Sequence, residues 1–199
     1  MRSIAVGRLL RANTTGCTVG CRVDQQDSPA FGDMLRIPQA DGTTLYGLVY
    51  EIAIEDDGLV RQLISVPQVS PEIIEDNRLN RNVPIEMSVT FIGWERGGIL
   101  SQTRVPHPPL TLDEIFACEA EELLRFTSSG RFSYLRSLLR NEDLPAADLV
   151  TAHLRQVLGA ARPGDAAQLM QGTLNEVVAL LKDDYPQLMD VLTAVSEIL

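Results

Sequence analysis

The stretch Tyr46-Gly47-Leu48-Val49-Tyr50-Glu51-Ile52-Ala53-Ile54 decides the fold of the first half of the chain. Every second residue, beginning with Tyr46, is apolar, and Val49 and Ala53 add apolar bulk on the opposite parity. A period of two indicates a β-strand, and apolar side chains on both parities indicate a strand covered on both faces. We therefore expect a long central strand here.

Other segments of the first half alternate in the same way. Cys17–Val23 and Ile85–Phe91 each have apolar residues on one parity and small or polar residues on the other, which predicts strands with one buried face. The other expected strands are Ile4–Leu10, Met34–Ile37, Leu59–Val66 and Ile99–Val105, about seven in all. The segment Pro71–Asn80 follows Ser70, a good N-cap, and is expected to form a short helix or turn.

The turns between these strands favour an antiparallel arrangement. Asp41-Gly42, Asp56-Asp57-Gly58 and Arg96-Gly97-Gly98 offer glycine for the positive φ that tight hairpins require. Short strands joined in this way have unpaired edges, and closure into a small barrel removes them. We expect an antiparallel β-barrel.

The second half has the period of helices. Pro106–Pro109 reads as a stiff connector, and the next segment is either a helix capped by Thr111–Glu114 or a short strand over Ile115–Cys118 with a helix from Glu119. Apolar stripes then predict helices over Phe132–Arg140 and Pro145–Ala161, followed by two more that end at Leu181 and Leu199. The expected fold class is segregated α+β, with a barrel at residues 1–109 and a helical domain at residues 110–199.

Charge and composition exclude several functions. The chain has 199 residues, 17 basic and 27 acidic, and a net charge of −10, so its long-range field repels nucleic acid and direct nucleic-acid binding is not expected. Its apolar runs fall short of the roughly 20 residues that cross a bilayer, so we expect a soluble, cytoplasmic protein without a membrane partner. The three cysteines, an odd number, fit a reducing compartment.

Three segments carry a family resemblance. Val6-Gly7-Arg8-Leu9-Leu10, Phe31-Gly32-Asp33-Met34-Leu35-Arg36-Ile37 and Tyr46-Gly47-Leu48-Val49-Tyr50-Glu51-Ile52 resemble, in order and spacing, the HAS barrel shared by HerA-type DNA translocases and rotary ATP synthase subunits. The resemblance covers about Ile4 to Leu124, including the proline connector. It implies a barrel that packs subunits around a ring and docks partner proteins.

The chain departs from those relatives after the barrel. The HerA-type ATPase has a phosphate loop of the form G-x-x-x-x-G-K-[ST], whereas the only lysine here, Lys182, stands between Leu181 and Asp183 in an expected helix. Nucleotide hydrolysis is therefore not carried over. We expect no enzyme activity, no cofactor and no small-molecule substrate.

Other candidate sites favour ordinary structural roles. Cys17 and Cys21 would lie roughly 13 Å apart along a strand, too far for a disulfide or a shared metal. His107 and His153 lack any metal-ligand spacing, and the carboxylate pairs Asp56-Asp57 and Asp183-Asp184 are typical of solvated surface. We expect no metal site and no catalytic residue.

The candidate interface residues lie in the second half. A stripe on the last helix has the 4-3-4 spacing of a packed face and consists of Leu188, Leu192, Val195 and Leu199. Either the chain's own helices cover this stripe or another subunit does. Arg136 and Arg140, one helical turn apart, are candidates for gripping a phosphate or a partner's carboxylate.

Two functional hypotheses follow. The first is a non-enzymatic interaction or assembly module that binds another protein or itself through a HAS-like barrel and its helices. The alternative is an accessory factor of a HerA-type DNA-processing system that contacts DNA or modulates the translocase or nuclease.

Overall fold

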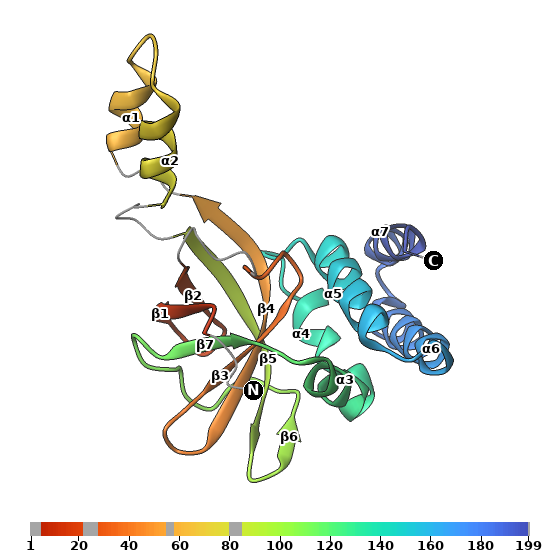
Figure 1. The fold of residues 1–199 in the computed structure, drawn as a ribbon. Helices are drawn as coiled ribbons and strands as arrows, with labels where there is room; N and C mark the ends of the chain where they lie inside the picture. Colours follow the sequence, from red (N-terminus) through yellow and green to blue (C-terminus); the bar gives the residue numbers. More distant parts are fainter. Residues whose placement is uncertain (1–4, 22–27, 55–57, 80–84, 199) are drawn as a thin grey trace.

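The computed structural model describes residues 5–21, 28–54, 58–79 and 85–198. Seven antiparallel strands occupy the first part of the chain (Figure 1). Their bounds are β1 (Gly7–Ala12), β2 (Gly16–Cys21), β3 (Met34–Pro38), β4 (Thr43–Ile54), β5 (Ile85–Arg96), β6 (Ile99–Ser101) and β7 (Glu114–Ala117).

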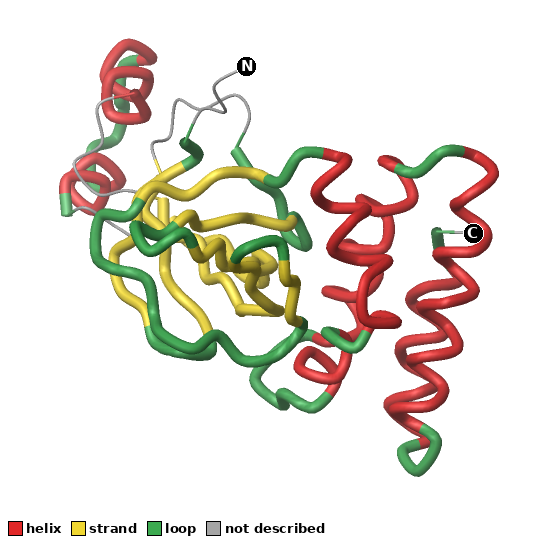
Figure 2. The backbone as a smooth tube through the Cα atoms, turned by 90° about the horizontal axis from the view of Figure 1, so that it is seen from below, coloured by secondary structure: helices red, strands yellow, loops and turns green. Residues whose placement is uncertain are grey.

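Six of these strands close into a barrel in the order β2-β1-β7-β3-β4-β5, and β2 pairs with β5 to complete the ring (Figure 2). Strand β5 pairs with β4 along its whole length. On its other edge its first half pairs with β2, from Ile85 to Thr90, and its end pairs with the short strand β6. The expected barrel, and with it the segregated α+β fold class, is confirmed.

Strand β4 shows why its sequence is apolar on both parities. Leu45 and Val49 point into the barrel interior, while Tyr46 and Leu48 belong to a second core that the barrel shares with the helices. Beyond Val49 the strand loses its cover, and Ile54 is 68% exposed. The prediction of a strand buried on both faces holds only for its first half.

Two glycines of the resembling segments allow close approaches. A Cβ at Gly47 would lie 2.5 Å from Val89 Cγ1 and 2.8 Å from the carbonyl oxygen of Thr90. Gly32 has a φ of +88°, and a Cβ there would lie 2.5 Å from the Cβ of Ala152. The first glycine lets β4 meet β5 closely, and the second lets the turn before β3 dock on the helical part.

The segment Leu59–Val66, expected to be a strand, is instead a helix. α1 (Leu59–Ile64) and α2 (Pro71–Leu79) stand between β4 and β5 and lie apart from the other helices (Figure 1). The four-residue spacing of Leu59 with Leu63 and of Val60 with Ile64 fits a helix as well as it fits an alternating strand. Here the helical alternative formed, directly after Gly58 with its φ of +78°.

The chain after residue 109 first adds a strand to the barrel and then becomes helical. β7 pairs with β1 and β3, so of the two alternatives left open by the sequence, the strand before a helix is the observed one. The helices that follow are α3 (Ala120–Ser128), α4 (Leu135–Leu139), α5 (Ala146–Ala160), α6 (Pro163–Leu181) and α7 (Tyr185–Ser196). A 3-10 turn, η1 (Ser129–Phe132), separates α3 from α4.

The helix expected over Phe132–Arg140 is shorter than predicted. Residues 130, 131 and 132 all have positive φ, with values of 60°, 53° and 60°, which is incompatible with a continuing α-helix. The α-helix therefore begins only at Leu135.

Helices α3 to α7 pack on one side of the barrel (Figure 1). The core between them joins Met34, Tyr46, Leu48 and Ile92 from the barrel to residues of α3 through α7. The barrel interior forms a separate core around Leu9, Val19, Leu35 and Ile115. Within the described part of the chain, no helix has the length and apolar character needed to span a membrane.

Candidate functional site

A cavity of about 670 Å³ opens between the barrel and α4, and we call it the seam cavity. Its barrel wall comes from the turn before β2, from Thr90 and Phe91 of β5, and from the segment that leaves β6 at Gln102. Its helical wall comes from α4 and the loop that follows at Asn141 and Asp143. A smaller cavity of about 290 Å³ adjoins it, sharing Thr15 and Asn141.

Both predicted interface arginines line the seam cavity, together with a third that the sequence did not single out, Arg104. None of these three guanidinium groups has a carboxylate partner in the described part of the chain. The described arginines of the barrel differ, because each has a carboxylate within 4 Å. These pairs are Arg8 with Glu114, Arg11 with Glu86, Arg36 with Glu122 and Arg96 with Asp41.

Gln102, which lines the seam cavity, makes three hydrogen bonds to the helical part of the chain. Its Nε2 donates to the carbonyl oxygen of Phe126 at 2.7 Å, and its Oε1 accepts from Ser133 Oγ at 2.9 Å and from the backbone N–H of Tyr134 at 3.2 Å. One half-buried amide thereby connects the segment after β6 to α3 and to the start of α4.

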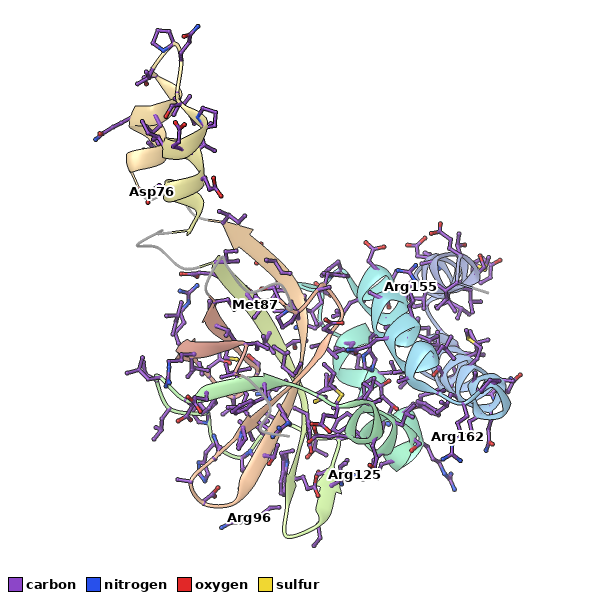
Figure 3. The ribbon with its side chains drawn as sticks, in the orientation of Figure 1. Asp76, Met87, Arg96, Arg125, Arg155 and Arg162 are labelled. Atoms are coloured by element: carbon purple, nitrogen blue, oxygen red, sulfur yellow. The ribbon has the colours of Figure 1, made fainter. Side chains whose placement is uncertain are left out.

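A second polar cluster lies between the barrel and α3, and its charges are paired (Figure 3 labels Arg125). Arg125 donates two hydrogen bonds to Glu95, with Nη1 at 3.0 Å from Oε1 and Nη2 at 2.6 Å from Oε2. The Tyr46 hydroxyl lies 3.0 Å from Glu95 and 2.9 Å from Glu122. The hydrogen bonds from Arg125 hold the pKa of Glu95 below its usual range, and burial followed by the charge of Glu122 raises the pKa of Tyr46. The cluster fastens α3 to the barrel.

The cysteines are unsuited to nucleophilic chemistry. Cys17 and Cys21 are buried in the barrel interior, and burial raises their pKa values to about 12 and about 11. Burial also raises the pKa of Cys118 well above its ordinary value, with Glu122 adding to the shift. A reactive cysteine requires the opposite shift, because the thiolate is the nucleophile.

The two histidines lie in different surroundings. His153, on α5, is 1% exposed, and its ring stands edge-on to Tyr134 with the centroids 5.6 Å apart. Burial lowers the pKa of His153 to about 4, with the backbone of Gly32 acting in the opposite sense. His107 is exposed in the proline connector. Over the described ranges, no three His, Cys, Asp or Glu side chains gather where they could hold a metal ion.

Of the two candidate carboxylate pairs, the structure describes only Asp183-Asp184. Asp184 is the N-cap of α7, and its Oδ1 accepts from the backbone N–H of Gln187 at 3.1 Å. Asp183 is exposed beside it. Asp56 and Asp57 lie outside the described residues.

The predicted stripe on α7 faces the chain's own helices. Val195 is 1% exposed and belongs to the core shared by the barrel and the helices, against which Leu188 packs half-buried. Leu192 is also half-buried, and Leu199 lies outside the described residues. Of the two alternatives left open by the sequence, coverage by the chain's own bundle is the observed one for the described residues.

An apolar surface that sequence reasoning missed lies on the segment of residues 58–79, which we call the arm. No arm residue belongs to either buried core as far as the structure is described. Six of the twelve large apolar side chains that the described residues expose lie on the arm or at the end of β4 that leads to it. They are Ile52, Ile54, Ile64, Val66, Ile73 and Ile74. The one available sequence signal was the helical spacing within Leu59–Ile64.

Comparison of the chain with protein-family models and with curated proteins finds no match. The assignment of a function therefore rests on the geometry described above.

Proposed function

We propose that this chain is a non-enzymatic protein–protein interaction or assembly module, built on a HAS-like barrel, whose contact surface is the arm. The observation that carries the proposal is the gathering of exposed isoleucines on one projecting segment. The paired charges beside α3 and the buried thiols give no support to a catalytic role. We place this role in the cytoplasm, which the odd number of cysteines supports.

Three isoleucine side chains on the arm are exposed to solvent. Ile64 is 79% exposed, Ile73 is 49% exposed and Ile74 is 40% exposed. Fully burying one such side chain contributes about 1.5–3 kcal/mol, and several exposed apolar side chains on one segment favour an interaction site. Binding of a partner over the arm would bury these side chains, and this burial would stabilise the complex.

We propose a second copy of this chain as the occupant. The resemblance supports this choice, because HAS barrels pack subunits around a ring. With a net charge of −10, two copies repel each other at long range, so an apolar contact between them should strengthen as salt screens the repulsion. An assembly held by ion pairs would weaken under the same change.

Sedimentation velocity on the full chain over a range of protein and salt concentrations tests the proposal. We expect reversible self-association that increases with salt and is abolished by the double variant Ile64→Glu, Ile73→Glu. The control is Ile99→Glu at the start of β6, because Ile99 is 71% exposed and lies outside the arm. This control should associate like the parent chain.

Two outcomes would contradict the proposal. A chain that stays monomeric under all conditions would remove self-assembly. Equal loss of association in the arm variant and in the Ile99→Glu control would show that added negative charge, and not the arm surface, is responsible.

A further inference from the structure

The seam cavity has a local charge opposite to that of the whole chain. Arg104, Arg136 and Arg140 line it together with one carboxylate, that of Asp143, so its lining carries three positive charges against one negative charge. The whole chain has a net charge of −10. A cluster of like charges is unfavourable in the absence of a counter-charge, and a concave site concentrates its field.

The cavity also has unused hydrogen-bond donors. Each guanidinium group has five N–H donors in a fixed fork that matches the oxygens of phosphate. The hydroxyl hydrogens on the helical wall are already used, because Ser133 donates to Gln102 and Ser137 donates to the carbonyl oxygen of Tyr134 at 2.7 Å. The guanidinium groups are therefore the donors that this wall offers to a ligand, and phosphate oxygens are acceptors that match them.

The arginines stand on a fixed support. Arg136 and Arg140 are one turn apart at α4, whose residues Leu135, Leu138 and Leu139 are buried in the core shared with the barrel. Gln102 joins this helix to the segment that carries Arg104. Backbone positions held in this way lower the free energy that ordering a binding site requires.

The cavity is larger than a phosphate group. Its volume of about 670 Å³ lies inside the range of about 300–1,000 Å³ that is typical of small-ligand sites. The space beyond the arginines can therefore accept an organic group attached to the phosphate.

From these observations we infer that the seam cavity is a binding site for a small phosphorylated organic ligand, held through its phosphate by Arg104, Arg136 and Arg140. This inference is independent of the arm and of the assembly proposed above. It assigns no reaction to the ligand.

Phosphorus NMR and titration calorimetry with phenyl phosphate and with inorganic phosphate test the inference. We expect both probes to bind the parent chain at low ionic strength, with phenyl phosphate the tighter of the two. The double variant Arg136→Gln, Arg140→Gln should weaken binding at least about tenfold, because hydrogen bonds from charged groups are lost. The affinity of Arg136→Lys, Arg140→Lys should lie between those of the parent chain and the glutamine variant, since lysine keeps the charge but not the forked donor geometry.

The control is Arg155→Gln, Arg162→Gln, which removes the same charge from exposed arginines on and after α5 that do not line the seam cavity. Figure 3 labels both residues. This control variant should bind phenyl phosphate as the parent chain does. Circular dichroism melting of each variant separates loss of binding from loss of folding.

Four results would overturn the inference. Equal weakening in the control variant would reduce the effect to the general field of the chain. Binding of benzoate as tight as that of phenyl phosphate would assign the site to carboxylates, and tight binding of a single-stranded oligonucleotide through the same arginines would assign it to nucleic acid. Absence of phosphate binding at millimolar probe would remove the site altogether.

Discussion

The arm and the last helix of the bundle both carry large apolar side chains but bury them differently. On α7, Val191 is 0% exposed and Val195 is 1% exposed, because α5 lies against that face. On the arm, Ile64 and Ile73 stay in contact with solvent, and Figures 1 and 2 show the arm apart from the bundle. An apolar stripe shows that a helix has a face to cover, but the stripe does not show which molecule covers it.

The largest expected effect is on α7, the packed helix of this comparison. Val191→Asp places a carboxylate where the side chain is fully buried and should lower the free energy of unfolding by about 4 kcal/mol. Ile64→Asp on the arm should change it by less than about 0.5 kcal/mol. Urea denaturation of both variants measures the difference, and similar losses would show that the arm is part of the folded core.

Acidification should next loosen the contact of α5 with the barrel through His153. Its pKa is about 4 in the folded chain and about 6.5 when unfolded, so between these values the unfolded chain binds the proton more readily. Stability should therefore fall by roughly 3 kcal/mol as the pH drops from 6.5 to 4. The variant His153→Phe should lose this part of the pH dependence in urea titrations. An unchanged slope would mean that His153 can be protonated in place.

The same contact can be strained at neutral pH from the barrel side. Gly32→Ala requires a side chain at a φ of +88° and within 2.5 Å of Ala152. We expect a loss of about 2 kcal/mol, from the backbone conformation and the displaced helix together. Gly58→Ala at the start of the arm also has positive φ but meets no atom within 4 Å, so it should lose less. Thermal unfolding compares the two, and a larger loss at Gly58 would contradict this account.

The smallest expected effect concerns the hydrogen bonds between Arg125 of α3 and Glu95 of the barrel. Glu95→Gln should lower stability by about 1 kcal/mol at pH 7, because the two hydrogen bonds from Arg125 lose their charge assistance. The lowered pKa of Glu95 means that this contribution is present at neutral pH and disappears as the pH falls through the folded value. Parent and variant should therefore converge in acid. A constant difference down to pH 2 would point to packing instead of charge.

The strands with one buried face could be predicted from the sequence because alternation reports burial directly. Cys17–Val23 and Ile85–Phe91 overlap β2 and β5 for this reason, with Val23 outside the described residues. Leu59–Val66 was wrong because a short apolar segment satisfies both periods, and no core contact in the described chain decides between them. β7 depended on pairing with β1 and β3, which is not encoded locally.

The candidate sites divide in the same way. Arg136 and Arg140 could be found from their helical spacing, since one turn separates them. Arg104 could not, because it reaches the seam cavity only through the path of the chain after β6, some 30 residues away in sequence. Leu188 and Val195 of the α7 stripe pack on the chain's own core, but the spacing alone left open which molecule covers them, because that depends on the position of α5.

Hydrogen exchange followed by mass spectrometry at increasing protein concentration tests the central claim most directly, namely that the arm is a surface made for contact. α1 has six residues and α2 has nine, so both should exchange quickly in an isolated chain, because helices this short are marginal without packing. We predict that exchange over residues 59–79 slows as concentration and salt rise, while exchange in the barrel and in α5–α7 stays constant. Exchange in the arm that remains fast at every concentration, in a chain that associates through another region, would contradict the account.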